Sequence, residues 1–143
     1  MRAMVMTDFG PADKVFVQDE LPTNAPGHGE LLVRVHATSV NPLDLQIRRG
    51  DYREDTRPPL VIGYDVSGVV EQAGAGVTRF KPGDEVWYLA RFFHGPGAYA
   101  EYHVVEESIV ARKPSSLSHV EAASLPLVAG APTWCWTRWA RRR

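Results

Sequence analysis

The chain has 143 residues, 44% of them hydrophobic and 23% charged, which is typical of a single globular domain and excludes a disordered chain. The net charge is −1, but residues 1–130 hold twelve basic and seventeen acidic side chains, so we expect no nucleic-acid partner. The single cysteine excludes an intramolecular disulfide framework and a multi-cysteine metal site.

The first ten residues, MRAMVMTDFG, reach Asp8 before an apolar run develops, which is unlike a signal peptide. No stretch approaches the ~18 apolar residues of a membrane span. We therefore expect a cytoplasmic protein with no membrane partner.

Short apolar or β-branched runs separated by Gly and Pro turns predict about seven strands before residue 113. These runs are RAMVMT (2–7), VFVQDE (15–20), LLVRVHATSV (31–40), DVSGVVEQAG (65–74), DEVWYLA (84–90), AYAEYHVV (98–105) and SIVARK (108–113). Many short strands favour a barrel or sandwich over a βαβ sheet. The predicted fold class is mainly β with short helices.

Two segments interrupt the strand pattern. NPLDLQIRR (41–49) predicts a short helix with Asn41 as its cap and Pro42 in its first turn. SLSHVEAASLP (116–126) predicts a second helix, because Ser118 and Glu121 have the spacing of a capping box and Pro126 ends the run.

Two features that resemble binding motifs are better explained structurally. Gly74-Ala75-Gly76 imitates the start of a dinucleotide fingerprint, but it lacks the third glycine and is followed by a strand, so we expect a turn. His36, His94 and His103 lack metal-ligand spacing, and we expect each at the surface or in packing. The charged, proline-bearing composition of segment 51–59 predicts a mobile surface loop.

Four stretches, in this order, resemble the GroES-like catalytic domain of the medium-chain dehydrogenase/reductase superfamily. They are GELLVRVHATSVNPLDLQIRRGDY (29–52), PLVIGYDVSGVVEQAGAGVTRFKPGDEV (59–86), GAYAEYHVV (97–105) and LSHVEAASLPLVAG (117–130). The patterns N-P-x-D at 41–44 and R-x-G-x-Y at 48–52 are most similar to the zinc-independent quinone oxidoreductase branch. The resemblance implies a partly open GroES-like β-barrel over residues 1–130.

The residues also argue against a catalytic zinc. Such a site needs about three Cys, His or carboxylate ligands. The zinc-dependent relatives have a cysteine after the third strand and a later G-H-E, whereas this chain has Asn41 and Gly63-Tyr64-Asp65. Asn and Tyr are poor zinc ligands, so we expect no metal.

The resemblance places Asn41, Asp44 and Tyr52 around the nicotinamide end of NADPH and the substrate cleft. It implies that Tyr52 donates a hydrogen bond to a quinone or enone oxygen, that Asn41 contacts the cofactor, and that Asp44 holds the loop and helix start. The residues also allow a structural interpretation. Asn41 then only caps the helix, Asp44 bonds local backbone, and Tyr52 covers a loop.

The phosphate-binding G-x-G-x-x-G appears nowhere in the chain. Relatives continue beyond the LPLVAG region into a Rossmann domain, which we expect to be missing here. Residues 131–143, APTWCWTRWARRR, form a Trp/Arg-rich tail that we interpret as out of frame or disordered. A membrane-surface or nucleic-acid tail is the alternative.

We therefore expect the substrate-side domain of an NADPH-dependent, zinc-independent quinone or enone oxidoreductase, truncated and inactive alone, whose partner is a small-molecule substrate. The alternative is a non-enzymatic GroES-like barrel, acting as a binding module or remaining as a remnant. We also expect self-association through the face that a cofactor domain would cover.

Overall fold

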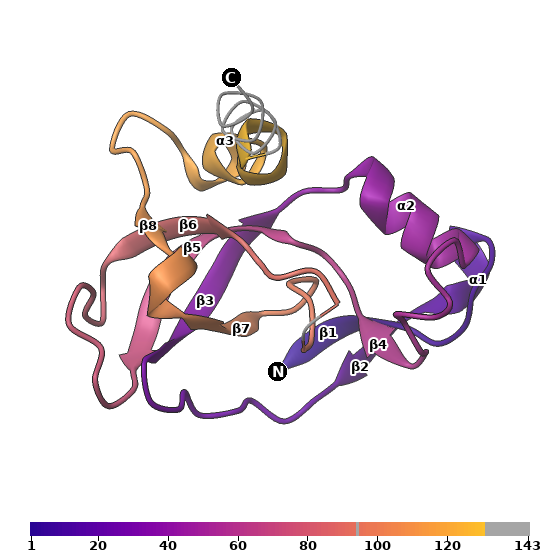
Figure 1. The fold of residues 1–143 in the computed structure, drawn as a ribbon, viewed down its shortest axis with the longest axis horizontal. Helices are drawn as coiled ribbons and strands as arrows, with labels where there is room; N and C mark the ends of the chain where they lie inside the picture. Colours follow the sequence, from indigo (N-terminus) through magenta and orange to yellow (C-terminus); the bar gives the residue numbers. More distant parts are fainter. Residues whose placement is uncertain (94, 131–143) are drawn as a thin grey trace, which may run out of the picture.

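The structure is a computed structural model that describes residues 1–93 and 95–130. Within them, eight strands form two antiparallel sheets that do not close into a barrel (Figure 1). The first sheet has the order β2 (Phe16–Glu20), β1 (Arg2–Met6), β4 (Leu60–Val61). The second has the order β7 (Tyr102–Glu106), β3 (Glu30–Thr38), β5 (Asp65–Ala73), β6 (Glu85–Leu89), β8 (Ala111–Arg112).

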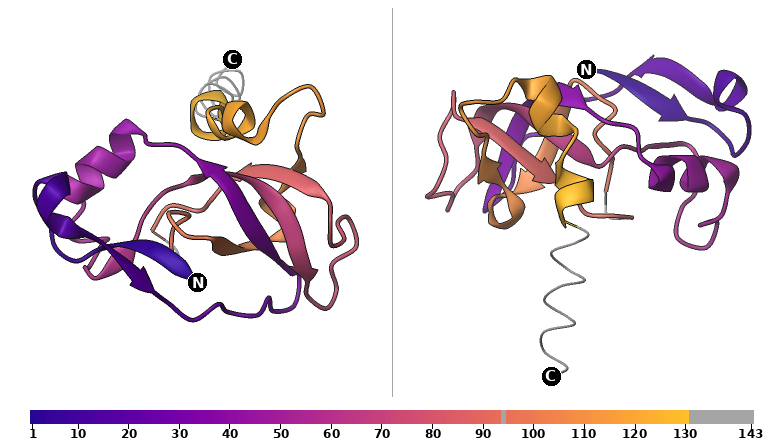
Figure 2. Two further views of the ribbon diagram at one scale, coloured as in Figure 1. Left: turned by 180° about the vertical axis from the view of Figure 1, so that it is seen from behind. Right: turned by 90° about the horizontal axis from the view of Figure 1, so that it is seen from above.

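Short helices join and cover these sheets. They are α1 (Ala12–Val15), α2 (Pro42–Arg49), α3 (His119–Ala123) and a 3-10 helix, η1 (Glu107–Ile109). Figure 2 shows α2 and α1 at the end of the molecule formed by the first sheet, and α3 over the second sheet. Residues 126–130 are helical again after α3. This architecture is mainly β with short helices, as predicted.

The seven predicted strands are present, with three differences. The strand expected over 108–113 is divided into η1 and the two-residue β8. The connection between the first two strands, expected as a Gly/Pro turn, includes α1. The very short β4, which pairs Val61 with Val5, was not anticipated. Each difference involves an element of two to four residues, too short to carry a periodic pattern.

The core lies between the two sheets and centres on β3 and β5. Leu31 and Val33 of β3 are fully buried, as are Val66 and, within 1%, Val70 of β5. The two strands approach closely at Gly68, where a Cβ atom would lie 2.2 Å from the carbonyl oxygen of Arg34. This packing fixes the start of β5 and the segment that leads from β3 to α2, which together carry the candidate site.

The predicted turn at Gly74–Gly76 is confirmed: it connects β5 to β6, and Gly76 has a φ of 83°. No described helix is long and apolar enough to cross a membrane. His94 and the predicted tail 131–143 lie outside the described residues.

Candidate functional site

The N-terminus of α2 is built by a reciprocal pair of polar side chains. Asn41 occupies the cap position, Pro42 begins the helix, and Asp44 completes a capping box. The Asp44 Oδ2 atom accepts a hydrogen bond of 2.7 Å from the main-chain N–H of Asn41. The helix ends at Gly50, whose φ of 90° lies in the left-handed region that favours glycine. The helix predicted here and its cap at Asn41 are present, and Asp44 belongs to the same capping box.

Asp44 is almost completely buried, at 2% exposed. Its second oxygen, Oδ1, has no hydrogen-bond partner among the described residues. Burial raises the pKa of Asp44, and the charge of Asp65 adds to the rise, whereas the Asn41 N–H and the nearby Tyr99 hydroxyl oppose it. The Tyr99 hydroxyl itself donates to the main-chain oxygen of Ser39 at 3.2 Å. Asp44 is therefore a buried acid at the base of the site.

Asp65, the first residue of β5, was not singled out as a site residue from the sequence. It is fully buried, and its Oδ2 atom accepts hydrogen bonds from Ser39 Oγ at 2.5 Å and from Asn41 Nδ2 at 2.8 Å. Its Oδ1 atom accepts from the main-chain N–H of Leu127 at 2.7 Å. One carboxylate thus joins the segment before α2 to the helical segment after α3. An acidic residue opening an otherwise apolar strand is the signal that could have identified it.

Tyr64 precedes Asp65 and is also buried, at 5% exposed. Burial raises the pKa of Tyr64 to about 12, and the negative charge of Asp44 contributes to the rise. The phenol is therefore neutral at physiological pH. Its ring meets Phe92 edge-on, with centroids 5.0 Å apart.

An exposed aromatic surface lies beside this buried polar group. Phe92 and Phe93, in the loop after β6, are each 36% exposed. Phe93 has a φ of 60°, which is uncommon for a residue other than glycine. Its ring lies 5.2 Å from that of Tyr52, which follows α2. We call Tyr52, Tyr64, Phe92 and Phe93 the aromatic wall.

The three predicted site residues thus fall into two places. Asn41 and Asp44 form one hydrogen-bonded unit at the start of α2. Tyr52 lies beyond the other end of α2, half-buried against Phe93, and its hydroxyl makes no hydrogen bond to any residue in 1–93 or 95–130. The geometry allows the Tyr52 hydroxyl to donate to a ligand, and it also fits a residue that covers the loop.

A second polar network docks α3 onto the sheet. His119 Nδ1 lies 2.8 Å from Ser67 Oγ, and its Nε2 lies 3.2 Å from Glu85 Oε1. The order Ser–His–acid is that of nucleophilic hydrolases. Ser67 is fully buried, however, so a substrate cannot reach its oxygen. The network is a structural one, and it also brings His36 next to His119, which the sequence did not predict.

His103 is confirmed as a packing histidine. It is buried, and its Nδ1 atom lies 2.9 Å from the hydroxyl of Tyr88. Burial lowers the pKa of His103 to about 4, against a small opposing effect of the Pro96 carbonyl. The imidazole is therefore neutral at pH 7.

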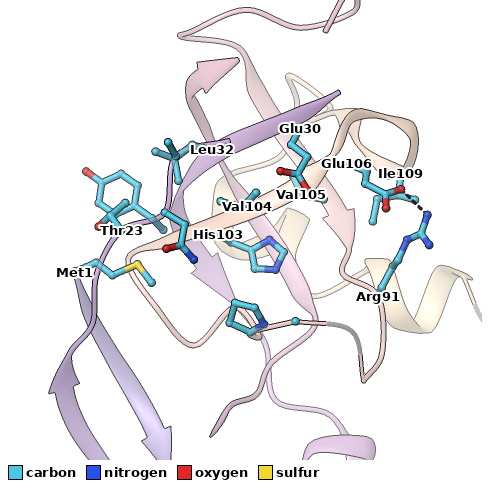
Figure 3. Close-up of a pocket in the computed structure, with 15 residues that line it drawn as sticks. Met1, Thr23, Glu30, Leu32, Arg91, His103, Val104, Val105, Glu106 and Ile109 are labelled. Carbon is cyan, nitrogen blue, oxygen red and sulfur yellow. Dashed lines mark hydrogen bonds and ion pairs between the residues drawn. The ribbon is translucent and has the colours of Figure 1, made fainter. Parts of the chain in front are cut away.

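Two hollows lie outside the predicted site residues. A groove of about 570 Å³ runs between β1 and the end of β3 and includes Val40 and Tyr99. Figure 3 shows a pocket of about 430 Å³ over β3 and β7, with His103 facing it and the Arg91–Glu106 ion pair at one end. Arg91 and Pro96 line this pocket, whereas Phe92 and Phe93, which lie between them in the sequence, belong to the aromatic wall. The loop after β6 therefore borders both the pocket and the aromatic wall.

Most polar atoms of the Asn41–Asp44–Asp65 group already take part in hydrogen bonds within the protein. No three His, Cys, Asp or Glu side chains within residues 1–93 and 95–130 are grouped to hold one. Both oxygens of Asp65 already accept hydrogen bonds, and Tyr64 is a neutral phenol. Asn41 and Tyr64 occupy the positions at which the zinc-dependent relatives have ligands, and neither supplies a good one.

Comparison with known proteins identifies relatives. The model of the alcohol dehydrogenase GroES-like domain matches residues 27–115. An NADPH-dependent alkenal/one oxidoreductase of Arabidopsis thaliana is 36% identical over 89% of this chain and 34% of its own length. A zinc-type alcohol dehydrogenase-like protein of Staphylococcus aureus is 44% identical over 80% of this chain and 32% of its own.

Solved structures give the same result. The quinone oxidoreductase of Coxiella burnetii superposes with a TM-score of 0.82 at 35% identity, over 88% of this chain and 41% of that one. The chain therefore spans about a third of the length of the curated relatives and less than half of this solved structure.

Proposed function

Because the chain belongs to the alcohol dehydrogenase GroES-like domain family, within the medium-chain dehydrogenase/reductase superfamily, we propose that it forms the substrate-side part of an NADPH-dependent, zinc-independent reductase of quinones or enones. The observation that carries this proposal is the aromatic wall beside the buried Asn41–Asp44–Asp65 group. Planar apolar rings next to a few fixed polar atoms suit a flat, electron-poor substrate.

The Asn41–Asp44–Asp65 group would support the nicotinamide end of NADPH. NADPH supplies a hydride when bound, and Asn41 would contact its nicotinamide end. The described strands pair only in antiparallel fashion, and Gly74–Gly76 is a turn. These residues therefore offer no strand–glycine–helix site for the pyrophosphate. We expect the 143 residues by themselves to bind NADPH weakly and to turn over little or no substrate.

The proposal that no zinc takes part rests on the side chains that would have to bind it. Asn41 directs its amide nitrogen to Asp65 and Ser39, and Tyr64 stays protonated at neutral pH. A substrate oxygen would then be polarised by hydrogen bonds and not by a metal. The Tyr52 hydroxyl, which has no partner in the described part of the chain, is the donor we assign to it.

Asp44 would act from beneath the site. Its bond to the Asn41 N–H would hold the carboxyl group at the helix start, and its unpaired Oδ1 atom and raised pKa would let it respond to a change of charge nearby. We assign it the role of holding the helix start and of setting the local potential, without contact to the substrate.

The test uses the purified chain with NADPH and with duroquinone, whose fully substituted ring does not add to the thiol of Cys135. We expect duroquinone to shift the NMR signals of Tyr52 and Phe93, and NADPH to bind only at millimolar concentration without turnover. Shifts spread evenly over the protein would contradict the substrate side of the proposal. Micromolar NADPH binding with quinone turnover would contradict the expected inactivity.

A further inference from the structure

One edge of the second sheet is open. The strand β7 pairs with β3 on one side, and within residues 1–93 and 95–130 no strand pairs with its other side. An open strand edge carries a row of backbone N–H and C=O groups that point away from the sheet. The register of the β3–β7 pair shows which residues carry them.

Hydrogen bonds at the two ends of this pair define the row. The Val35 N–H donates to the Glu101 oxygen at 2.8 Å, and the Glu107 N–H donates to the Gly29 oxygen at 2.9 Å. In an antiparallel ladder such bonded pairs alternate with non-bonded ones, so every second residue of β7 faces outward. These outward residues are Tyr102, Val104 and Glu106. No hydrogen bond from another described residue reaches their backbone groups.

The pocket of Figure 3 lies along this open edge. All five residues of β7, Tyr102–Glu106, line it. Successive side chains of a strand point to opposite faces, so a hollow that meets all five residues follows the edge of the strand. Figure 3 shows Met1 and Thr23 at one end of the pocket and the Arg91–Glu106 ion pair at the other. Its volume of about 430 Å³ lies in the range of ligand pockets.

Another part of the pocket wall is formed by residues 23–25. This exposed segment connects β2 to β3 and has no regular secondary structure. Its backbone makes no hydrogen bond to the residues that the structure describes. The segment can therefore shift to admit a strand, at about 4.8 Å from β7, without breaking a backbone hydrogen bond.

The charged side chains that line the pocket already have partners. Glu30 accepts from the Gly27 N–H at 2.8 Å, and Arg91 is bonded to Glu106 at 2.5 Å. Burial lowers the pKa of His103 to about 4, so this ring is neutral at pH 7. No unpaired charge draws an ion into the pocket. The row of backbone groups on β7 remains, and its complement is the backbone of an uncharged, extended peptide.

The neighbours of Val104 determine which side chains such a peptide can have. In an antiparallel addition, the ligand residue opposite Val104 exchanges two hydrogen bonds with it, and its side chain lies on the same face as Val104 and Leu32. Leu32 is buried and Val104 half-buried, which favours an apolar residue there. The two adjacent ligand residues point to the face of His103 and Val105, which are both buried, so small residues are favoured.

We propose that the open edge of β7 binds a short, uncharged peptide segment, which adds to the second sheet as an antiparallel strand. The segment pairs with Tyr102–Glu106, a length of about 13 Å at roughly 3.3 Å per residue, and places an apolar residue opposite Val104. The hydrogen bonds involve no residue of the aromatic wall, so this site is independent of the proposed reductase function.

The test is an NMR titration of the 143-residue chain with the capped peptide acetyl-Thr-Ala-Val-Ala-Thr-amide. We expect a Kd of about 0.1 to 1 mM, because the peptide gains a few hydrogen bonds and one apolar contact. At saturation, amide hydrogen exchange should slow about 10-fold or more at Tyr102, Val104 and Glu106. The amides of His103 and Val105, which face β3, should change little.

A second peptide carries an N-methyl group on its central valine. The methyl group removes the donor to the Val104 oxygen, so this peptide should bind about 10-fold more weakly to the same protein. The comparison uses only the wild-type chain and therefore holds whether or not a variant of β7 folds.

Val104→Pro makes the same change on the protein. Its N–H is not part of the β3–β7 ladder, so proline removes one outward donor and leaves that ladder in place. We expect the peptide to bind about 10-fold more weakly. Gln18→Pro is the matched control, because Gln18 lies opposite Met4 on the edge strand β2 and its N–H also points outward. It should bind the peptide as wild type does.

Four results would overturn the proposal. The first is unchanged exchange at Val104 with the peptide at about 5 mM. The second is equal binding of the N-methylated peptide, which would place the ligand elsewhere. The third is slow exchange at Val104 in the free chain that increases with protein concentration, which would assign the edge to a second copy of this chain. The fourth is slow exchange at every concentration, which would mean that residues 22–26 close the edge.

Discussion

The imidazole rings of His36 on β3 and His119 on α3 lie with their centroids 4.5 Å apart, tilted by 31°. Burial lowers the pKa of His119, and the charge of His36 lowers it further, whereas Glu85 raises it. Because its neutral form is favoured in the folded state, His119 stabilises the docking of α3 fully above pH ~6.5 and less as the pH falls below that value.

Two substitutions should move this pKa in opposite directions. His36→Gln removes a like charge and should raise the pKa of His119, while Glu85→Gln removes an attractive charge and should lower it further. NMR titration of the His119 ring measures both. No shift in either variant would show that burial alone controls the group.

The Tyr88–His103 contact predicts a separate loss of stability in acid. The pKa of His103 lies at about 4 in the folded chain because the ring is buried, compared with 6.5 ordinarily. The unfolded chain therefore binds more protons between these values, and stability falls as the pH falls through them, by about 3 kcal/mol in total.

Urea unfolding at pH 7 and pH 4 checks this contribution. His103→Gln keeps an acceptor for the Tyr88 hydroxyl but does not titrate, so its stability should fall less than that of wild type over this range. His28→Gln, at an exposed position, serves as the control. Equal acid sensitivity of wild type and His103→Gln would contradict the assignment.

The elements predicted well from the sequence are those with local causes. The α2 helix is fixed by Asn41, Pro42 and Asp44 within four residues of each other, and α3 by the Ser118–Glu121 capping box. Local spacing alone identifies such caps. The strand β3 is identified by its local run of β-branched and apolar residues, of which Leu31, Leu32 and Val33 are buried.

The parts of the site that were missed depend on contacts between distant residues. Tyr52 meets Phe93, and Asp65 meets Leu127, across 41 and 62 positions. No local periodicity records such pairs. The stacking of His36 on His119 has the same origin, since it requires α3 to return over β3. The sequence therefore indicated the residue types of the site but not its aromatic wall.

Asp44 provides a test of charge burial in the site itself. Because burial raises its pKa, the folded chain holds this proton more tightly than the unfolded chain, and the carboxyl group destabilises the fold increasingly as the pH rises from its unfolded pKa through its folded pKa. Asp44→Asn keeps an acceptor for the Asn41 N–H and removes the charge. We expect its stability relative to wild type to be higher at pH 7 than at pH 3.5.

Asp44→Ala separates the cap from the charge. It removes the acceptor for the Asn41 N–H, which should cost about 1 to 2 kcal/mol at pH 3.5, and it also removes the buried charge, so its net cost should be smaller at pH 7. Urea titrations of the three proteins at both pH values give the comparison. A relative stability of Asp44→Asn that does not vary with pH would show that the group is not buried in its charged form.

The aromatic wall predicts how quinone affinity responds to substitution. Phe93→Leu removes the ring that lies against Tyr52 but keeps an apolar side chain, so duroquinone should bind about 2- to 10-fold more weakly, the range of one aromatic contact.

Tyr52→Phe keeps the ring and removes the hydroxyl, so a loss of similar size should appear only for ligands with an oxygen to accept its hydrogen bond. Durene, which has the same methyl-substituted ring without oxygens, should bind Tyr52→Phe and wild type equally. Phe16→Leu, at a half-buried aromatic position on β2, controls for general loosening of the fold. Equal weakening by Phe16→Leu and Phe93→Leu would mean that the wall does not contact the ligand, because only a direct contact distinguishes the two positions.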